Sequence, residues 1–463
     1  MNLDPQQTKA VEHGDGPALV LAGPGSGKTA VITERTLRLV KKTKAPRRVL
    51  VITFTKAAAK EMEERYNAKA SVFERGVNFG TFHAVFFRIL REAPAYRGVK
   101  IIRNEDRYAT ALRVFSKKCG SRRFANDDVN HFLSAVSRKK SGKQEDGTGL
   151  PISASEFDEA SREYDKELER RGFIDFDDIL TKCLSYLQND VKALKRWREA
   201  FDYFLVDEYQ DINRVQYDII KLLAAPKNNL FVVGDDDQSI YAFRGAEPAL
   251  AKEFLKDFPD AKTILLDRNY RSASCITRAS LAVVKHNKER FEKKITADTQ
   301  RKGKVESVCF EDRREEYEKL AEMLKAKGAE SSAVLFRTNR QPAMLAHILE
   351  EKGVKFTVYG KLESLYTHHV TQDILAYARI AAGSAERADF LRICNRPERY
   401  IKRELFTNER VDLDELEKRA AARLEDVSPL VSDIKAIRGL DPYGVVMYVK
   451  KAAGYDEYLK NCA

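Results

Sequence analysis

The stretch Ala18-Leu19-Val20-Leu21-Ala22-Gly23-Pro24-Gly25-Ser26-Gly27-Lys28-Thr29 decides the fold of this chain. An apolar run typical of a buried strand leads into a glycine-rich turn, and residues 30–35 then follow a helical pattern. Strand, turn and helix in this order predict a phosphate-binding loop, because glycines let backbone N–H groups converge on phosphate oxygens at a helix N-terminus. A flexible Gly/Ser loop with a stray lysine is the alternative, and the flanking strand and helix argue against it.

Each part of this loop has a predicted task in binding a nucleoside triphosphate. The backbone of residues 22–27 surrounds the phosphates; its members are Ala22, Gly23, Pro24, Gly25, Ser26 and Gly27. Ala22 stands where the usual pattern has its first glycine. Lys28 is expected to reach the β- and γ-phosphates, and the Thr29 hydroxyl is expected to be a ligand of Mg²⁺.

The composition predicts a globular protein of several domains. The chain has 463 residues, of which 43% are hydrophobic and 33% are charged, and this balance excludes an intrinsically disordered protein. Lys and Arg outnumber Asp and Glu by 82 to 70, for a net charge of +12. The excess is typical of a protein with a polyanionic partner such as nucleic acid, although a generally basic protein would share it.

The cysteines and the hydropathy pattern exclude several other classes. Six cysteines lie far apart with no C-x-x-C spacing, which indicates neither a zinc site nor a disulfide framework and favours a reducing cytoplasm. No apolar run approaches the length of a membrane span, and the N-terminus has no apolar signal segment. We therefore expect a cytoplasmic protein without a membrane partner.

A second strong signal is the apolar strand pattern 201–206, which ends in Asp207 and Glu208. A phosphate loop requires carboxylates of this kind beside it. Asp207 is expected to hold Mg²⁺ through its water shell, and Glu208 to orient or deprotonate the attacking water. Surface carboxylates at a strand end are the alternative.

Strand–helix units repeat along the first part of the chain and predict a parallel α/β sheet. Phe54, Phe82 and His83 each stand at the carboxyl end of a predicted strand, where open α/β sheets bind ligands. Each of them is equally well explained as a core aromatic residue. Between about 89 and 171 the pattern becomes polar and helical, which predicts a helical insertion.

The polar stretches after the next two apolar runs carry further candidates. Gln238 is a candidate contact for the γ-phosphate or the attacking water, and Tyr241, Phe243 and Arg244 form an aromatic–basic set suited to stacking bases and meeting backbone phosphates. The neighbouring pair Tyr270-Arg271 is suited to stacking on adenine and neutralising charge on the transferred phosphoryl group.

Six motifs in this order resemble those of the UvrD/Rep/PcrA family, superfamily 1 DNA helicases that move 3′ to 5′ on single strands. The motifs are Ala22–Thr29, Thr53-Phe54-Thr55, Gly80-Thr81-Phe82-His83, Val206–Gln210, Gly234–Gly245 and Asn269-Tyr270-Arg271-Ser272. The resemblance implies an α/β fold with two tandem RecA-like domains, ATP with Mg²⁺ between them, and single-stranded DNA or a single-strand/duplex junction as the partner. It implies a first RecA-like domain over 1–88 and 172–270, with the insertion at 89–171. An incomplete second domain would cover 271–382, and the start of its helical insertion 383–463.

The resemblance also implies roles residue by residue. Gln7 would contact adenine, Arg35 and Tyr270 would flank the base, and Gly23–Thr29 would bind the phosphates. Asp207 and Glu208 would act on magnesium and water, and Gln238 and Arg271 would sense the γ-phosphate. The residues expected to meet DNA are Phe54, Thr81, Phe82, His83, Tyr241, Phe243, Arg244, Arg337 and Asn339. Position 243 is often tryptophan in the family, so phenylalanine offers a smaller stacking face.

The last part of the chain fits only the beginning of a second RecA-like domain. Residues 332–339 predict a buried strand with a polar end. Two family motifs that would follow are not found before Ala463, so we expect a fragment of a longer protein. The leading hypothesis is an ATP-dependent DNA helicase or translocase acting in repair or recombination. The alternatives are an ATP- and DNA-binding protein with little hydrolysis of its own, and the motor part of a helicase–nuclease.

Overall fold

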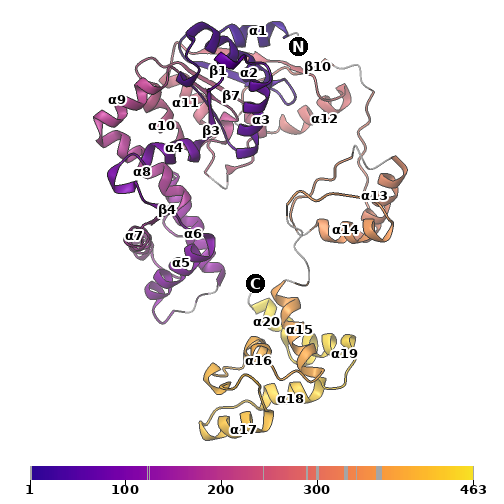
Figure 1. The fold of residues 1–463 in the computed structure, drawn as a ribbon. Coiled ribbons are helices and arrows are strands. Elements are labelled where there is room, and N and C mark those ends of the chain that lie inside the picture. The colour runs from indigo at the N-terminus through magenta and orange to yellow at the C-terminus, as the bar shows by residue number, and fades with distance from the viewer. Residues whose placement is uncertain are drawn as a thin grey trace. The chain divides into compact units, whose positions relative to one another are not determined.

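The computed structural model describes residues 3–122, 124, 126–242, 245–287, 290–298, 302–327, 332–339, 341–360, 366 and 368–461. The chain forms two compact units, Met1–Glu306 and Ser307–Ala463 (Figure 1). The first unit is built on a parallel sheet. The described part of the second consists mainly of helices. No described helix combines the length and the apolar character needed to cross a membrane.

Six parallel strands form the sheet of the first unit, in the order β3-β2-β6-β7-β1-β8. They are β1 (Ala18–Ala22), β2 (Val49–Thr53), β3 (Asn78–Thr81), β6 (Tyr203–Val206), β7 (Leu230–Gly234) and β8 (Lys262–Leu266). Every residue of β1, β2, β6 and β7 is buried, as expected for strands covered by helices on both faces. Because all strands run in the same direction, their carboxyl ends meet at one edge, where the phosphate loop follows β1.

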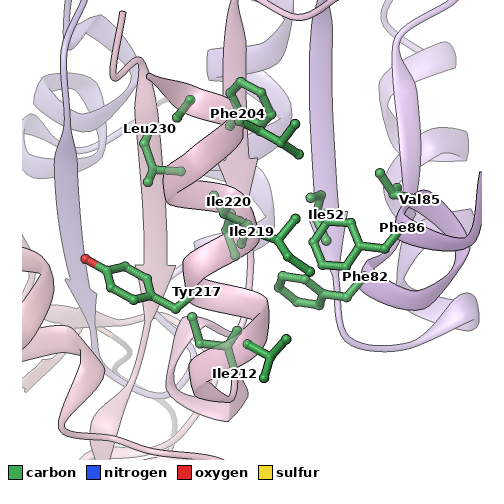
Figure 2. Packing of buried hydrophobic residues seen from close by; sticks show 14 of the residues in the cluster. Ile52, Phe82, Val85, Phe86, Phe204, Ile212, Tyr217, Ile219, Ile220 and Leu230 are labelled. Atoms are coloured by element: carbon green, nitrogen blue, oxygen red, sulfur yellow. The ribbon is translucent and has the colours of Figure 1, made fainter. Parts of the chain in front are cut away.

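Helices cover both faces of this sheet. Leu19 and Leu21 of β1 face one side, together with α4 (Phe82–Leu90), α8 (Phe176–Asn189), α9 (Val191–Ala200), α10 (Arg214–Ala224) and α11 (Leu250–Asp257). Figure 2 shows this core, in which Phe82 and Phe86 of α4 lie close to Ile219 and Ile220 of α10. The alternate β1 residues, such as Val20, face α1 (Pro5–Glu12), α2 (Lys28–Thr43) and α3 (Lys56–Asn67). This three-layer α/β arrangement confirms the predicted fold class.

Three helices between β3 and β6 form a separate hydrophobic core. They are α5 (Asn104–Cys119), α6 (Asn126–Lys140) and α7 (Ala154–Arg170), and they fill the segment predicted as a helical insertion. The entry strand β4 (Lys100–Ile101) pairs in parallel with the exit strand β5 (Phe173–Ile174). Lys140, the last residue of α6, forms ion pairs of 2.7, 2.9 and 2.8 Å with Asp165, Asp175 and Asp178. It thereby joins the insertion to the N-terminus of α8 in the sheet domain.

The first unit continues past the sheet. After β9 (Arg268–Asn269) the chain forms α12 (Ser274–Val284) and returns to β10 (Thr296–Ala297), which pairs with β9. The compact unit therefore extends to Glu306, beyond the domain boundary at residue 270 that the resemblance implies.

In the second unit, α13 (Arg313–Lys327) packs with α14 (Pro342–Glu351). The prediction of a buried strand at 332–339 is wrong, because these residues carry no strand and Leu335 is 93% exposed. A strand requires a hydrogen-bonding neighbour, and none pairs with this segment in the described part of the unit. A helical core follows, made of α15 (His369–Ala381), α16 (Arg387–Ile393), α17 (Leu413–Ala422), α18 (Ser428–Ile437), α19 (Pro442–Met447) and α20 (Tyr455–Asn461).

Candidate nucleotide and nucleic-acid site

The glycine-rich loop connects β1 to α2 at the carboxyl edge of the sheet. Gly25 and Gly27 have φ values of +66° and +84°, a region that favours glycine. The buried Ser26 hydroxyl donates a hydrogen bond of 2.7 Å to the Gly23 carbonyl oxygen and tightens the turn. No side chain caps the N-terminus of α2. The first amides of this helix therefore suit an anion such as a phosphate.

Neighbouring residues approach the loop so closely that only glycines fit. Gln7 Nε2 donates a hydrogen bond of 2.9 Å to the Ser26 carbonyl oxygen, and a Cβ atom on Gly27 would lie 2.8 Å from the same nitrogen. A Cβ atom on Gly25 would lie 2.7 Å from Arg271 Cβ. Gln7 Oε1 also accepts a hydrogen bond from the Asp4 backbone N–H, so both ends of the Gln7 amide hold the loop and α1 in place.

The two carboxylates predicted from the sequence lie beside Lys28. Lys28 Nζ is 3.5 Å from Glu208 Oε2. Asp207 is 4% exposed, and burial, followed by the Glu208 charge, raises its pKa to about 7. Glu208 has a φ of +51°, which turns the chain sharply at the end of β6.

Asp207 Oδ1 has no hydrogen-bond partner among the described residues. A buried carboxylate oxygen in this state is the kind of ligand that a divalent cation satisfies. Asp207 and the half-buried Thr29 therefore fit the predicted Mg²⁺ ligands.

A chain of hydrogen bonds continues from Glu208 to Gln238. Gln210 Nε2 donates to Glu208 Oε2 at 2.9 Å, and Gln210 Oε1 accepts from the Asp235 backbone N–H at 2.9 Å. Asp235 Oδ2 in turn accepts from Gln238 Nε2 at 2.6 Å. Gln210 was not predicted to have a role. Its position two residues after Glu208, on the same turn, is the sequence feature that could have indicated a role.

Tyr270 and Arg271 follow β9 and lie next to the loop. The Tyr270 N–H donates a hydrogen bond of 3.0 Å to the Gly25 carbonyl oxygen, and its hydroxyl donates to the Asp4 carboxylate. Tyr270 is 38% exposed. Arg271 is exposed, and its guanidinium makes no hydrogen bond or ion pair with residues in the described ranges. Both side chains are therefore available to a ligand at the loop.

The expectation that Arg35 flanks the base is wrong. Arg35 is 2% exposed and donates hydrogen bonds to the carbonyl oxygens of Val11, His13 and Gly14. Its guanidinium lies 4.4 Å from the centre of the Phe231 ring. Burial lowers the pKa of Arg35 to about 10. Arg35 lies two helical turns beyond Lys28, so its charge serves the packing of α2 rather than the ligand.

A groove of about 600 Å³ opens between the sheet domain and the helical insertion, within the first unit. Its lining includes Phe54, His83, Phe176 and Asp211. The Phe54 ring stacks on Tyr241 with centroids 4.8 Å apart, and His83 packs edge-on against Phe176, which is 56% exposed. Burial lowers the pKa of His83. The exposed Phe176 and the half-buried Phe54, Tyr241 and His83 are aromatic side chains of the kind that stack with bases.

The groove connects to the carboxylates through Gln210. Its Nε2 atom lies 3.3 Å from Asp211 Oδ2 and also holds Glu208. One amide therefore contacts the predicted general base and a residue that lines the groove. Neither Phe176 nor Asp211 was predicted from the sequence. Asp211 lies on the turn that directly follows Glu208, and this position could have indicated it.

The remaining predicted DNA contacts have different outcomes. Phe82 as a DNA contact is contradicted, because it is 2% exposed and packs against Phe86 in the core. The Thr81 hydroxyl caps α4 by accepting from the Ala84 N–H. Phe243 and Arg244 lie outside the described residues. Arg337 and Asn339 are exposed in the second unit.

Comparisons with known proteins agree with this geometry. The sequence profile of the UvrD/REP helicase N-terminal domain matches residues 3–259, and that of the UvrD-like helicase C-terminal domain matches residues 264–433. The chain is 34% identical to the ATP-dependent DNA helicase PcrA of Staphylococcus epidermidis over 416 residues, which cover 86% of this chain and 56% of the relative. The same identity is found over 420 residues with PcrA of Leuconostoc citreum, covering 86% and 55%.

The chain thus spans about half the length of the curated relatives that it matches. The N-terminal profile alone covers more than half of the chain, and it includes the phosphate loop, the carboxylate pair and the groove. This chain belongs to the UvrD/REP helicase family.

Proposed function

We propose that the chain hydrolyses ATP with Mg²⁺ and uses the energy to move along single-stranded DNA in the 3′ to 5′ direction, unwinding duplex DNA at single-strand/duplex junctions. The observation that carries the proposal is the continuous polar path from Lys28 through Glu208 and Gln210 to Gln238, with a branch to Asp211 in the aromatic groove. The direction of movement, a role in DNA repair or recombination and action in the cytoplasm rest on the family resemblance alone.

The geometry supports a mechanism in which ATP itself releases the general base. The Lys28 ammonium lies 3.5 Å from the Glu208 carboxylate. Phosphates bound at the loop would draw Lys28 away, and Glu208 would then accept the proton of the attacking water. Asp207 and Thr29 would hold Mg²⁺, which neutralises charge on the phosphate oxygens. Arg271 would approach the γ-phosphate as a second cation.

The groove supports coupling of this chemistry to DNA. Phe54 and Asp211 both line the groove that bases would enter, and Gln210 hydrogen-bonds to both Asp211 and Glu208. DNA binding would therefore shift the position of the general base. Because such binding relies on phosphate contacts, we expect it to weaken as salt is raised.

The decisive experiment measures ATP hydrolysis by the chain with and without single-stranded DNA. We expect strong stimulation by DNA and loss of turnover in Glu208→Gln, with ATP binding retained. Lys28→Ala should lose both binding and turnover. If Lys28→Ala hydrolyses ATP as fast as the unmodified chain, the assignment of the site is wrong.

A second candidate is a protein that binds ATP and DNA but hydrolyses slowly. Tight ATP binding with negligible turnover, with and without DNA, would support it. Displacement of streptavidin from only one labelled DNA end would instead support the motor and give its direction.

A further inference from the structure

Three consecutive carboxylates lie beside the predicted γ-phosphate contact. Asp235 follows β7, and Asp236 and Asp237 form the 3₁₀ turn η5 (Asp236–Gln238) with Gln238. Asp235 is fully buried, and the side chains of Asp236 and Asp237 are 5% and 7% exposed. Buried like charges repel one another strongly, so this turn requires compensation by a cation.

A segment distant in the sequence supplies that compensation. Lys293 Nζ lies 2.5, 2.6 and 2.9 Å from carboxylate oxygens of Asp235, Asp236 and Asp237, and its side chain is 1% exposed. Arg290 donates two hydrogen bonds of 2.8 Å to Asp237. Burial alone would lower the pKa of Lys293, but the three carboxylates raise it, so the ammonium stays charged.

The same segment also reaches the phosphate loop. Ile295 packs on Gly23 so closely that a Cβ atom there would lie 2.7 Å from Ile295 Cδ1. Thr296 and Ala297 form β10, which pairs with β9 directly before Tyr270. We call residues 290–297 the strap. It contacts both the aspartate turn and the loop that faces the phosphates.

We propose that Lys293 is a positioning residue of the triphosphate site, which fixes the aspartate turn so that Gln238 recognises the γ-phosphate. The inference deepens the proposed function and rests on it. Lys293 holds Asp235 Oδ1, and Asp235 Oδ2 accepts a hydrogen bond from Gln238 Nε2. An amide nitrogen carries two hydrogens, so one bond to Asp235 orients the amide and leaves the second N–H for a phosphate oxygen.

The charge of Lys293 has a second effect on the binding of the triphosphate. Without its ammonium, the turn would present three adjacent carboxylates close to a phosphate loop. A triphosphate carries more negative charge than a diphosphate, and the extra charge lies at the γ-phosphate. Removing Lys293 would therefore weaken binding of the triphosphate more than binding of the diphosphate.

The test compares Lys293→Met with Lys294→Met in the full chain. Lys294 is the adjacent, exposed residue, so the second variant is a matched control. Affinities for a non-hydrolysable ATP analogue and for ADP are measured by displacement of a fluorescent ADP, in the presence of Mg²⁺. We expect the preference for the triphosphate to fall roughly tenfold in Lys293→Met, the worth of a hydrogen bond to a charged group. It should be unchanged in Lys294→Met.

A double-mutant cycle separates positioning from general destabilisation. Gln238→Ala should lower the same preference, and the double variant with Lys293→Met should lose less than the sum of the two single losses, because part of the effect of Lys293 passes through Gln238. Additive losses, or an unchanged preference in a folded Lys293→Met, would overturn the proposal.

A second variant and the choice of a binding ratio as the readout allow the proposal to be rejected in every case. If Lys293→Met does not fold, Arg290→Gln removes the other cation from the turn, and an unchanged preference in that variant would overturn the proposal. The binding ratio does not depend on turnover. A chain that does not hydrolyse ATP but loses its triphosphate preference in Lys293→Met would reject the motor and retain the positioning role.

Discussion

Lys28 and Arg35 lie on the same helix, α2, and their charges have different partners. Lys28 forms an ion pair with Glu208 at the sheet edge, whereas Arg35 is buried against Phe231 and binds three backbone carbonyl oxygens. Those carbonyl groups belong to residues 11–14, more than twenty positions earlier in the chain. Arg35 therefore stabilises the join between α1 and β1, and a sequence pattern local to α2 cannot reveal this.

At this scale we predict that Arg35→Met destabilises the fold without weakening nucleotide binding. Three carbonyl groups would lose a charged donor in a buried place, a loss of about 3 kcal/mol. The melting temperature should fall by about 5 °C, while the affinity for ADP changes less than about twofold. Arg38→Met, whose side chain is 55% exposed, is the control and should melt as the unmodified chain does. If Arg35→Met instead loses much of its ADP affinity at unchanged stability, Arg35 contacts the adenine base after all.

Asp211 makes a prediction about pH. Burial, followed by the Glu208 charge, raises its pKa to about 6 from a usual value of 3.8, and its Oδ1 atom has no hydrogen-bond partner in the described structure. The folded state therefore holds this proton more tightly than the unfolded state. The stability that protonation gives is present below pH 4 and is lost as the pH rises through 6.

The variant Asp211→Asn imitates the protonated form at every pH. We expect it to stabilise the chain by about 1–2 kcal/mol at pH 8 and to have almost no effect at pH 4. Thermal melts of both proteins at the two pH values measure the difference. If Asp211→Asn stabilises the chain equally at pH 4 and pH 8, the ionisation of Asp211 is not the cause of the stabilisation.

Among the elements, the phosphate loop and the strap are fitted to each other. Gly23 leaves room for Ile295, and β10 beside β9 holds the strap in register. The loop therefore depends on a segment more than 260 residues later for its shape. A motif search that stops at the loop would not find this requirement.

We predict that Gly23→Ala weakens ATP binding through this contact. The added methyl group would lie 2.7 Å from Ile295 Cδ1 and force the loop or the strap to move. Overpacking of this kind typically costs 1–3 kcal/mol, so affinity should fall roughly tenfold. Ile295→Val removes Cδ1 and should partly restore affinity in the double variant. A double variant as weak as Gly23→Ala alone would place the cause in the loop backbone.

The parallel sheet and the phosphate loop were predictable from sequence because both have short-range signatures. Apolar runs of four or five residues gave the strands, and the glycine spacing gave the loop. The role of Phe82 could not be predicted from the sequence, because an aromatic residue at the end of a strand can either contact a ligand or belong to the hydrophobic core. The prediction of a strand from the apolar segment 332–336 failed for another reason. An apolar run indicates strand propensity, but a strand forms only where a neighbouring strand pairs with it.

At the scale of the whole first unit, the buried cation Lys140 joins the helical insertion to the sheet domain. Lys140 ends α6, its side chain is 9% exposed, and it binds Asp165 of α7 together with Asp175 and Asp178 at the start of α8. Burial and the neighbouring Asp175 charge raise the pKa of Asp178 to about 6, whereas Lys140 lowers the pKa of Asp175. This junction borders the groove, whose lining includes Asp177.

We predict that Lys140→Met loosens the insertion. Breaking a buried ion pair from one side typically costs 3–5 kcal/mol, because the remaining charges stay buried. Limited proteolysis should cut between the insertion and α8 at least about tenfold faster. Lys139→Met breaks the half-exposed pair with Asp158 and the contact of Lys139 with the Phe157 ring, both within the insertion, and should be cut at the original rate. Equal rates for Lys140→Met and the unmodified chain would show that the Lys140 ion pairs do not hold the insertion in place.

The short ribbon of β4 and β5 has a consequence for how such a chain changes during evolution. Lys100 is paired with Phe173 and Ile101 with Ile174, so the chain enters and leaves the insertion through adjacent strands, about 5 Å apart. A module whose two ends are neighbours can be exchanged, enlarged or lost by a single genetic event without rethreading the host domain. The sheet with its nucleotide site and the helical module are therefore free to diverge at different rates.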